Sequence, residues 1–97
     1  MRLPKPVSFD WDESNLEKNW KKHSVHYKEA EEVFFNKPVK IYRDVQHSQY
    51  EQRFTALGIT DSKRQLYTSF TIRNSKVRII SARDQSKKER RLYEKTT

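Results

Sequence analysis

The spacing of hydrophobic residues changes from a helical to a strand period in the middle of this chain, at Pro38. Before that proline, hydrophobic residues recur with helical spacing, at Tyr27, Ala30, Val33 and Phe34. After it, β-branched and aromatic residues alternate with polar ones, which is the period of a strand. This order predicts an α+β fold in which helices precede an antiparallel sheet and cover one of its faces.

The N-terminal part predicts a strand followed by a helix. Residues 7–11 alternate between hydrophobic and polar types, as in a half-buried strand. Asp12 or Ser14 can cap the helix, and Glu17 lies at capping-box spacing from Ser14. We expect this helix to end near His23.

The rest of the chain predicts a second helix, a four-stranded meander and a final helix. The second helix covers 27–35 and stops before Pro38, which disfavours helical geometry at the preceding residue. Strands are predicted at 39–43, 53–60, 65–73 and 76–83, and their short connections favour antiparallel pairing. Ser86 and Glu89 match a capping box at the start of a C-terminal helix, 87–95.

The hydrophobic core is predicted to be small. Only 33% of the 97 residues are hydrophobic, a fraction that alone would permit disorder. The twelve aromatic residues argue for a folded chain, because they lie in segments of regular periodicity. Trp11 and Trp20 each sit on a hydrophobic stripe and are assigned to the core. We expect one domain spanning residues 1–97.

Positive charge is concentrated in the second part of the chain. Residues 1–36 hold six Lys or Arg against seven Asp or Glu, whereas residues 37–97 hold fifteen against six. A surface of this kind attracts polyanions, of which nucleic acid is the commonest inside cells. The same charge also fits a solvated basic face or a docking surface for an acidic protein.

Several classes of site and location are disfavoured. Cysteine is absent, so disulfides and thiolate metal sites are excluded. The three histidines lack zinc-ligand spacing, and a single glycine cannot build a phosphate-cradling loop, so we expect neither metal nor cofactor. No hydrophobic run approaches the roughly 18 residues that span a bilayer. We expect a cytoplasmic protein that makes no membrane contact.

The candidate functional residues are arginines on strands and helix ends. These are Arg53, Arg73, Arg78, Arg83, Arg90 and Arg91. A guanidinium grips phosphate oxygens in bidentate fashion and stabilises added charge without a metal, which makes RNA cleavage by internal 2′-OH attack a possible chemistry. That reaction also needs proton transfer, for which the residue types at His47, Glu89 and Tyr93 are suitable.

Strand geometry limits which of these arginines can act together. On a regular strand Arg78 and Arg83 face opposite sides, so they share one site only if a bulge intervenes. On the last helix Lys87, Arg90 and Tyr93 lie roughly on one side, close to Arg83. An exposed basic helix with Leu92 and Tyr93 packed inward would produce the same pattern. The residues alone leave open an enzyme, a non-catalytic nucleic-acid-binding module and a structural partner subunit.

Four segments together resemble one protein family. The segments FDWD with Asn19, KHSVHYKEAEEVF, DVQHSQYEQRFTALG and RIISARDQSKKERRLYE resemble, in order, the signatures of the BrnT toxins of bacterial toxin-antitoxin operons. The resemblance extends from Phe9 to Glu94. It implies a RelE-like fold and a ribonuclease toxin that cleaves RNA and inhibits translation and growth.

The resemblance also implies site residues. Motif positions present in this sequence are His47, Arg53, Arg78, Ser81, Arg83, Glu89, Arg90 and Tyr93. We take His47, Arg53, Arg83, Glu89, Arg90 and Tyr93 as catalytic candidates. The RNA-binding candidates are Arg78, Ser81, Lys87, Lys88 and Arg91. Two positions depart from the family pattern, because Asn15 replaces a usual lysine and Ser24 replaces a usual glycine.

Partners follow from the same resemblance. A cognate BrnA-like antitoxin of the ribbon-helix-helix type would neutralise the toxin, in a heterotetramer of two toxins and two antitoxins. That complex would bind operator DNA through the antitoxin.

Overall fold

The structure is a computed structural model, and it describes residues 3–95. Within this range the elements run in the order α1 (Glu13–His23), α2 (Tyr27–Glu32), β1 (Lys40–Asp44), β2 (Arg53–Ile59), β3 (Gln65–Arg73), β4 (Lys76–Asp84) and α3 (Lys87–Lys95). The α+β fold class is confirmed. No helix in residues 3–95 is both long enough and apolar enough to cross a membrane.

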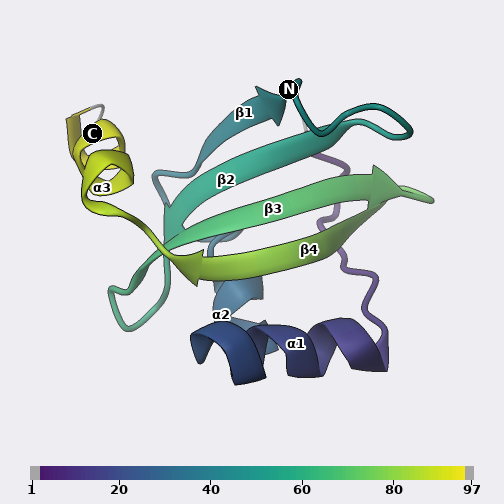
Figure 1. Cartoon of the computed structure of the whole chain (residues 1–97), viewed down its shortest axis with the longest axis horizontal. Coiled ribbons are helices and arrows are strands. Elements are labelled where there is room, and N and C mark those ends of the chain that lie inside the picture. Colours follow the sequence, from purple (N-terminus) through teal and green to yellow (C-terminus); the bar gives the residue numbers. More distant parts are fainter. Residues whose placement is uncertain (1–2, 96–97) are drawn as a thin grey trace.

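The four strands form an antiparallel meander in the order β1-β2-β3-β4 (Figure 1). Each strand begins and ends within one residue of its predicted position. The prediction succeeds because β-branched and aromatic residues mark the strands and short polar segments separate them. β1 and β4 are the outer strands of this sheet.

α1 begins directly after Asp12, one of the two caps predicted for it, and α2 begins at a cap that was not predicted. α1 starts at Glu13, and the carbonyl of Asp12 accepts a hydrogen bond from the Leu16 amide at 3.1 Å. The capping box expected at Ser14 is therefore not formed, because Ser14 already lies inside the helix. At α2 the imidazole of His26 accepts from the Lys28 amide, and Glu29 accepts from the His26 amide, each at 3.2 Å.

α1 and α2 cover one face of the sheet, and the main core lies between these two helices and that face. Buried residues of this core include Val33 and Phe34 after α2, Phe54 and Ala56 on β2, and Phe70 on β3. Gly58 is needed where β2 passes the end of α2, because an added Cβ would lie 2.5 Å from Cγ1 of Val33. We call the opposite side of the sheet the open face.

α3 lies on the open face, contrary to the expectation that all helices cover the same side. Leu57 alternates with Ala56 and Gly58 on β2 and so points toward the open face. It is nevertheless buried, as is Tyr93 of α3, and both residues lie outside the main core cluster. Figure 1 shows α3 beside one end of the sheet, away from α1 and α2.

The predicted N-terminal strand is reduced to one parallel bridge between Phe9 and Val77. The Val77 amide donates to the carbonyl of Ser8 at 2.8 Å, and the Asp10 amide donates to the carbonyl of Val77 at 2.9 Å. Pro6 has no amide proton to extend the ladder in one direction, and the chain enters α1 in the other. The segment still packs its apolar side chains on the core, as predicted from their alternation.

The two tryptophans differ in burial. Trp11 is partly buried against the core, and its indole donates to Oε2 of Glu31 at 2.7 Å. Trp20 is 57% exposed, so its assignment to the core was wrong. α1 contacts β4 through Asn19, which is buried and accepts from the Ala82 amide at 3.1 Å. The next residue along a helix points about 100° away, outside this narrow contact.

Ser24 adopts a left-handed backbone conformation in the turn between α1 and α2. Its φ is 54°, a value that residues other than glycine, asparagine and aspartate rarely adopt. The glycine expected from the family resemblance would fit this conformation without strain.

Candidate functional site

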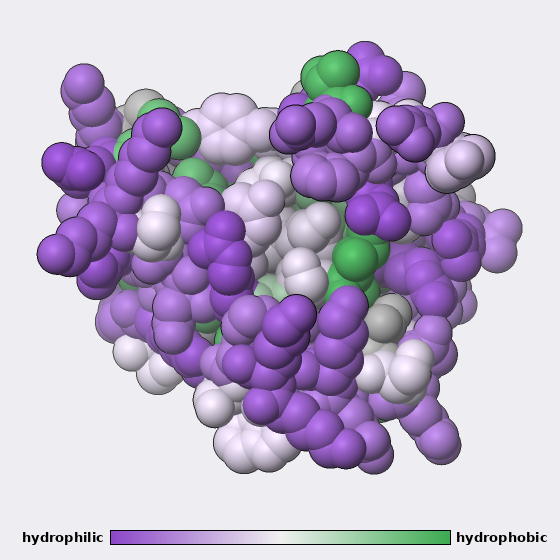
Figure 2. Space-filling model, in the orientation of Figure 1, coloured by the Kyte–Doolittle hydropathy of each residue, from purple (hydrophilic) through white to green (hydrophobic). Residues whose placement is uncertain are grey.

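The open face carries the candidate residues in three cross-strand rows. The registers of the sheet place Asp44, Arg53, Thr71 and Arg78 in the first row, Tyr42, Thr55, Ser69 and Ser81 in the second, and Lys40, Leu57, Tyr67 and Arg83 in the third. Arginines therefore lie in the two outer rows, and the middle row is uncharged. In the orientation of Figure 1, white and pale residues extend over the middle of the sheet, with hydrophilic residues on both sides (Figure 2).

A bulge in β4 puts Arg78 and Arg83 on the same face. Ser81 pairs with Ser69 and Ile79 pairs with Phe70, so Ile80 is an extra residue between the two pairs. The side-chain alternation is shifted by one at that point. The sequence allowed Arg78 and Arg83 to share a face only if a bulge lay between them, and the structure contains that bulge.

Arg78 forms ion pairs with the segment that precedes α1. Its guanidinium forms ion pairs with Oδ2 of Asp10 at 3.4 Å and with Oδ2 of Asp12 at 2.8 Å. These contacts join β4 to the residues that lead into α1. Arg78 was an RNA-binding candidate in the sequence, and in the structure its guanidinium makes a structural contact.

Arg83 is held by Glu89 at the start of α3. Its two terminal nitrogens contact the two carboxylate oxygens at 2.8 and 3.0 Å, and its guanidinium lies 4.0 Å from the centre of the Tyr67 ring. Glu89 also accepts from the Ser86 amide at 2.8 Å, which confirms the predicted capping box. The hydrogen bonds from Arg83 are the main reason that the pKa of Glu89 lies below its ordinary value.

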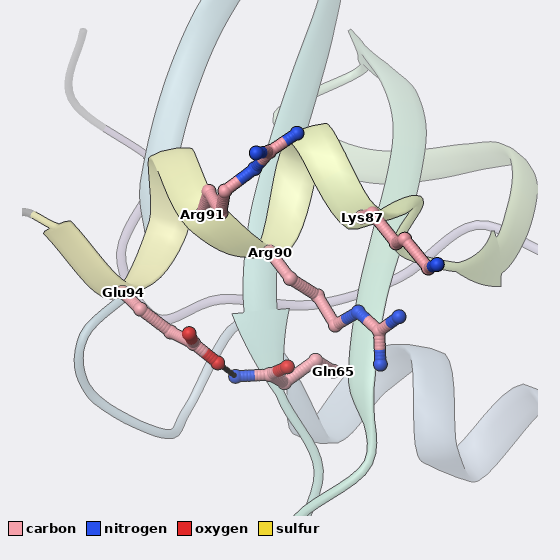
Figure 3. Close-up of a pocket in the computed structure, with 5 residues that line it drawn as sticks. All are labelled: Gln65, Lys87, Arg90, Arg91 and Glu94. Atoms are coloured by element: carbon pink, nitrogen blue, oxygen red, sulfur yellow. Dashed lines mark hydrogen bonds between the residues drawn. The ribbon is translucent and has the colours of Figure 1, made fainter.

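A basic pocket lies between α3 and the start of β3. This helix pocket has a volume of about 400 Å³ and is lined by Gln65, Lys87, Arg90, Arg91 and Glu94 (Figure 3). Gln65 donates to Oε2 of Glu94 at 3.1 Å, and Figure 3 shows the Arg90 side chain extending toward the same strand. Within residues 3–95 the guanidinium of Arg90 has no hydrogen-bond or ion-pair partner.

Tyr93 is an anchor of α3. Its side chain is buried, and its hydroxyl donates to the carbonyl of Pro38 at 2.7 Å. Burial raises the pKa of Tyr93 above its ordinary value. The hydroxyl is thus engaged inside the protein, away from the solvent-facing pocket that Arg90 lines.

A second pocket lies in the loop between β1 and β2. This loop pocket has a volume of about 230 Å³ and is lined by Gln46, His47, Gln49, Tyr50 and Arg53. Nδ1 of His47 lies 2.9 Å from Oδ2 of Asp44. A carboxylate accepts hydrogen bonds only, so this contact places the proton of a neutral imidazole on Nδ1 and leaves the lone pair on Nε2.

Ser48 connects the two sides of the loop pocket. Its hydroxyl donates to the carbonyl of Asp44 and accepts from the Arg53 amide at 3.0 Å. Because His47 is bound to Asp44, the histidine and Arg53 are fixed by one short chain of hydrogen bonds. The guanidinium of Arg53 has no partner among the residues that the structure describes.

The structure separates the candidates into two groups at opposite ends of β2. Arg53 is the first residue of β2, and Gln65 of the helix pocket pairs with Ile59, the last. Six residue steps along a strand correspond to about 20 Å. His47 and Arg53 therefore form one group, and Arg83, Glu89 and the cations of α3 form another, with Ser81 in the row between them.

Three residues that hold the candidate site side chains in place were not identified from the sequence. Asp44 is the last residue of β1 and lies three residues before His47, a spacing that could have suggested the contact. Ser48 carries no comparable signal, since a serine in a polar loop is common. Tyr67 could have been placed opposite Arg83 only from the strand register, which a single sequence does not give.

Among residues 3–95, no group of three or more histidine and acidic side chains is placed to hold a metal ion.

A comparison with protein families assigns the chain to one of them. The family model described as "Ribonuclease toxin, BrnT, of type II toxin-antitoxin system" matches residues 11–89. The chain belongs to the BrnT toxin family. This result confirms the resemblance found in the sequence. A search of curated proteins finds no match.

BrnT membership implies a ribonuclease toxin with an antitoxin partner. The matched range covers the elements from α1 to the first turn of α3. It includes His47, Arg53, Arg83 and Glu89, and it ends just before Arg90. The loop pocket thus lies wholly inside the BrnT match, whereas part of the helix pocket lies beyond it.

Proposed function

We propose that this protein is a metal-independent endoribonuclease whose reaction takes place in the loop pocket. The observation that supports this most directly is the imidazole of His47, held by Asp44 in a pocket that Arg53 also lines. A positioned base beside an unpaired guanidinium is what internal 2′-OH attack requires. The RelE-like fold implied by the family resemblance is compatible with this assignment.

The proposed reaction uses the imidazole of His47 and the guanidinium of Arg53. Nε2 of His47 takes the proton of a ribose 2′-OH, and the oxygen attacks the adjacent phosphorus. Arg53 stabilises the added charge on the phosphate oxygens. The bond from phosphorus to the 5′ oxygen breaks, and that oxygen takes a proton from solvent. The products are a 2′,3′-cyclic phosphate and a 5′-hydroxyl end.

The other candidates bind or position RNA in this proposal. Arg83 and Glu89 fix the start of α3, so that Arg90 faces the substrate. Arg78 and Tyr93 hold the fold through the contacts described above. The surface that binds the RNA backbone includes Ser81, Lys87, Lys88, Arg90 and Arg91.

The same surface is the proposed target of neutralisation. We propose a BrnA-like antitoxin of the ribbon-helix-helix type, in a complex of two toxins and two antitoxins that binds operator DNA in the cytoplasm. Covering a cationic site with an acidic segment would silence it, and the excess of positive charge after residue 36 supports this. Light scattering of the co-expressed pair measures the stoichiometry.

Purified protein tests the proposed function. Wild type should cleave RNA to 2′,3′-cyclic phosphate ends with excess EDTA present, and a host that expresses it should stop growing. His47→Gln and Arg53→Met should each reduce cleavage at least about 100-fold. Lys18→Met removes a charge from exposed α1, on the other face of the sheet, and should cleave like wild type.

Two results would contradict the proposal in different ways. Full activity of a folded His47→Gln protein would exclude the loop pocket as the site of chemistry. RNA that is bound but left intact by wild type would instead identify a non-catalytic binding module, or an inactive toxin retained as a partner subunit.

A further inference from the structure

The two basic pockets of the open face are too far apart to act on one phosphate. Arg53 and Gln65 lie at opposite ends of the paired strands β2 and β3, about 20 Å apart. An arginine side chain places only six bonds between its Cα and its terminal nitrogens. Arg53 and Arg90 therefore contact different phosphates of any nucleic acid that binds both pockets.

Each pocket contains an arginine that forms no salt bridge with a carboxylate of the described residues. Within residues 3–95, neither Arg53 nor Arg90 has an ion-pair partner, whereas Arg64, Arg73, Arg78 and Arg83 each do. Unpaired guanidinium groups are the ones available to a phosphate. Lys87 and Arg91 add further positive charge at the helix pocket.

The surface between the pockets is suited to bases and sugars. Its middle row consists of Tyr42, Thr55, Ser69 and Ser81, which carry hydroxyls and no charge. Tyr42 is 40% exposed, and Tyr50, at the loop pocket, is 99% exposed. Exposed aromatic rings stack on nucleobases, and hydroxyls bond to base edges and riboses.

We infer that the helix pocket is a phosphate-binding subsite separate from the reacting centre, and that single-stranded RNA crosses the open face between the two pockets. This inference rests on the proposed function. A stacked strand advances about 3.4 Å per nucleotide, and an unstacked strand covers the same span with fewer. A span of about 20 Å therefore corresponds to a bound segment of about four to seven nucleotides, with both end phosphates counted. Duplex RNA is disfavoured, because its paired bases cannot reach Tyr42 or Tyr50.

Binding of uncleavable RNA tests the inference independently of catalysis. The probes are an octanucleotide and a trinucleotide in which every 2′-OH is replaced by hydrogen, and fluorescence anisotropy gives their dissociation constants. The octanucleotide occupies both pockets, and the trinucleotide only one. Arg90→Ala should weaken octanucleotide binding at least about fivefold and lower its salt slope by about one. The trinucleotide fills a single pocket, so its affinity should fall more than about twofold in only one of the two variants Arg53→Ala and Arg90→Ala.

Control variants define the comparison. Arg53→Ala should also weaken octanucleotide binding, because it removes the cation of the other pocket. Lys18→Ala removes one positive charge from the opposite side of the sheet and should weaken binding of neither probe. An octanucleotide duplex should bind more weakly than the single strand.

Three outcomes would overturn the inference. They are weakening of trinucleotide binding by both Arg53→Ala and Arg90→Ala, an octanucleotide affinity no greater than that of the trinucleotide, and tighter binding of the duplex. Failure of the proposed function looks different, since a protein that binds the octanucleotide through both pockets yet never cleaves RNA would keep this inference and refute the chemistry.

Discussion

At the scale of single residues, the candidate site depends on which polar groups are already bound within the protein. Arg78 and Arg83 are engaged by carboxylates, whereas Arg53 and Arg90 have no partner among the described residues. The sequence offers six candidate arginines and does not show which of their guanidinium groups are paired. The structure ranks them, because a phosphate must compete with an existing ion pair at some and not at others.

Asp44 is predicted to position His47 for proton transfer. Asp44→Asn retains the shape of the side chain but no longer fixes the proton on Nδ1 of the imidazole, so the turnover number should fall about 10- to 100-fold. Affinity for uncleavable RNA should stay within about twofold, since Asp44 does not contact the backbone phosphate. Glu51→Gln is the control, because Glu51 carries the same charge in the same loop but pairs with Arg73 at 3.0 Å. Equal kinetics of the two variants would contradict the positioning role.

Ser24 is predicted to be a strained residue. At a φ of 54° a glycine avoids the contact between Cβ and backbone, so Ser24→Gly should raise the free energy of unfolding by up to about 1 kcal/mol. Ser14→Gly, inside α1, should lower it by about the same amount. Urea unfolding of both variants measures the difference. A loss of stability in Ser24→Gly would show that the turn tolerates the serine through contacts outweighing the strain.

At the scale of elements, the sequence predicted most of the helices and strands, but it did not predict how the candidate site residues are arranged. Hydrophobic period and β-branched runs defined the strands to within a residue. The face of a helix that becomes buried depends on the strand it meets, which explains the error at Trp20. The bulge at Ile80 comes from long-range pairing and has no local signal, yet it decides which face Arg78 occupies. Candidate residues could be named, but their division between two pockets could not.

The link between β4 and α3 is predicted to weaken in acid. The pKa of Glu89 is lowered chiefly by its hydrogen bonds with Arg83. Its carboxylate therefore adds stability above the pKa of an unfolded glutamate, about 4.3, and this stability is lost as the pH falls further toward the folded-state value. Glu89→Gln should lower the free energy of unfolding by about 1 kcal/mol at pH 7 and by less at pH 3.

Denaturant unfolding at the two pH values measures this effect. Glu94→Gln changes the same charge near the other end of α3, where a carboxylate is not favoured by the helix dipole, and should cost less at pH 7. A deficit of Glu89→Gln that is equal at pH 3 and pH 7 would show that its ion pair with Arg83 does not contribute to stability.

At the scale of the whole molecule, the two layers are joined by Arg64 as well as by the core. Its guanidinium donates to the carbonyls of His23 and Ser24 at 3.2 and 2.9 Å, and it pairs with Asp84 at 2.6 Å. Glu29 of α2 lies at 3.5 Å. One side chain from the turn between β2 and β3 thus connects the helical layer to the end of β4, immediately before α3.

Arg64 is therefore predicted to be the cation whose loss most affects stability. Arg64→Met keeps most of the apolar stem but leaves two carbonyls and two carboxylates without their donor, which should lower the free energy of unfolding by about 2 kcal/mol. Arg43→Met is the control, because Arg43 is exposed on β1 without a partner in the described residues, and it should change stability by less than about 0.5 kcal/mol. Urea denaturation followed by tryptophan fluorescence gives both values. If the two variants unfold at the same urea concentration, the layers are held by the hydrophobic core alone, and the contacts of Arg64 add nothing measurable.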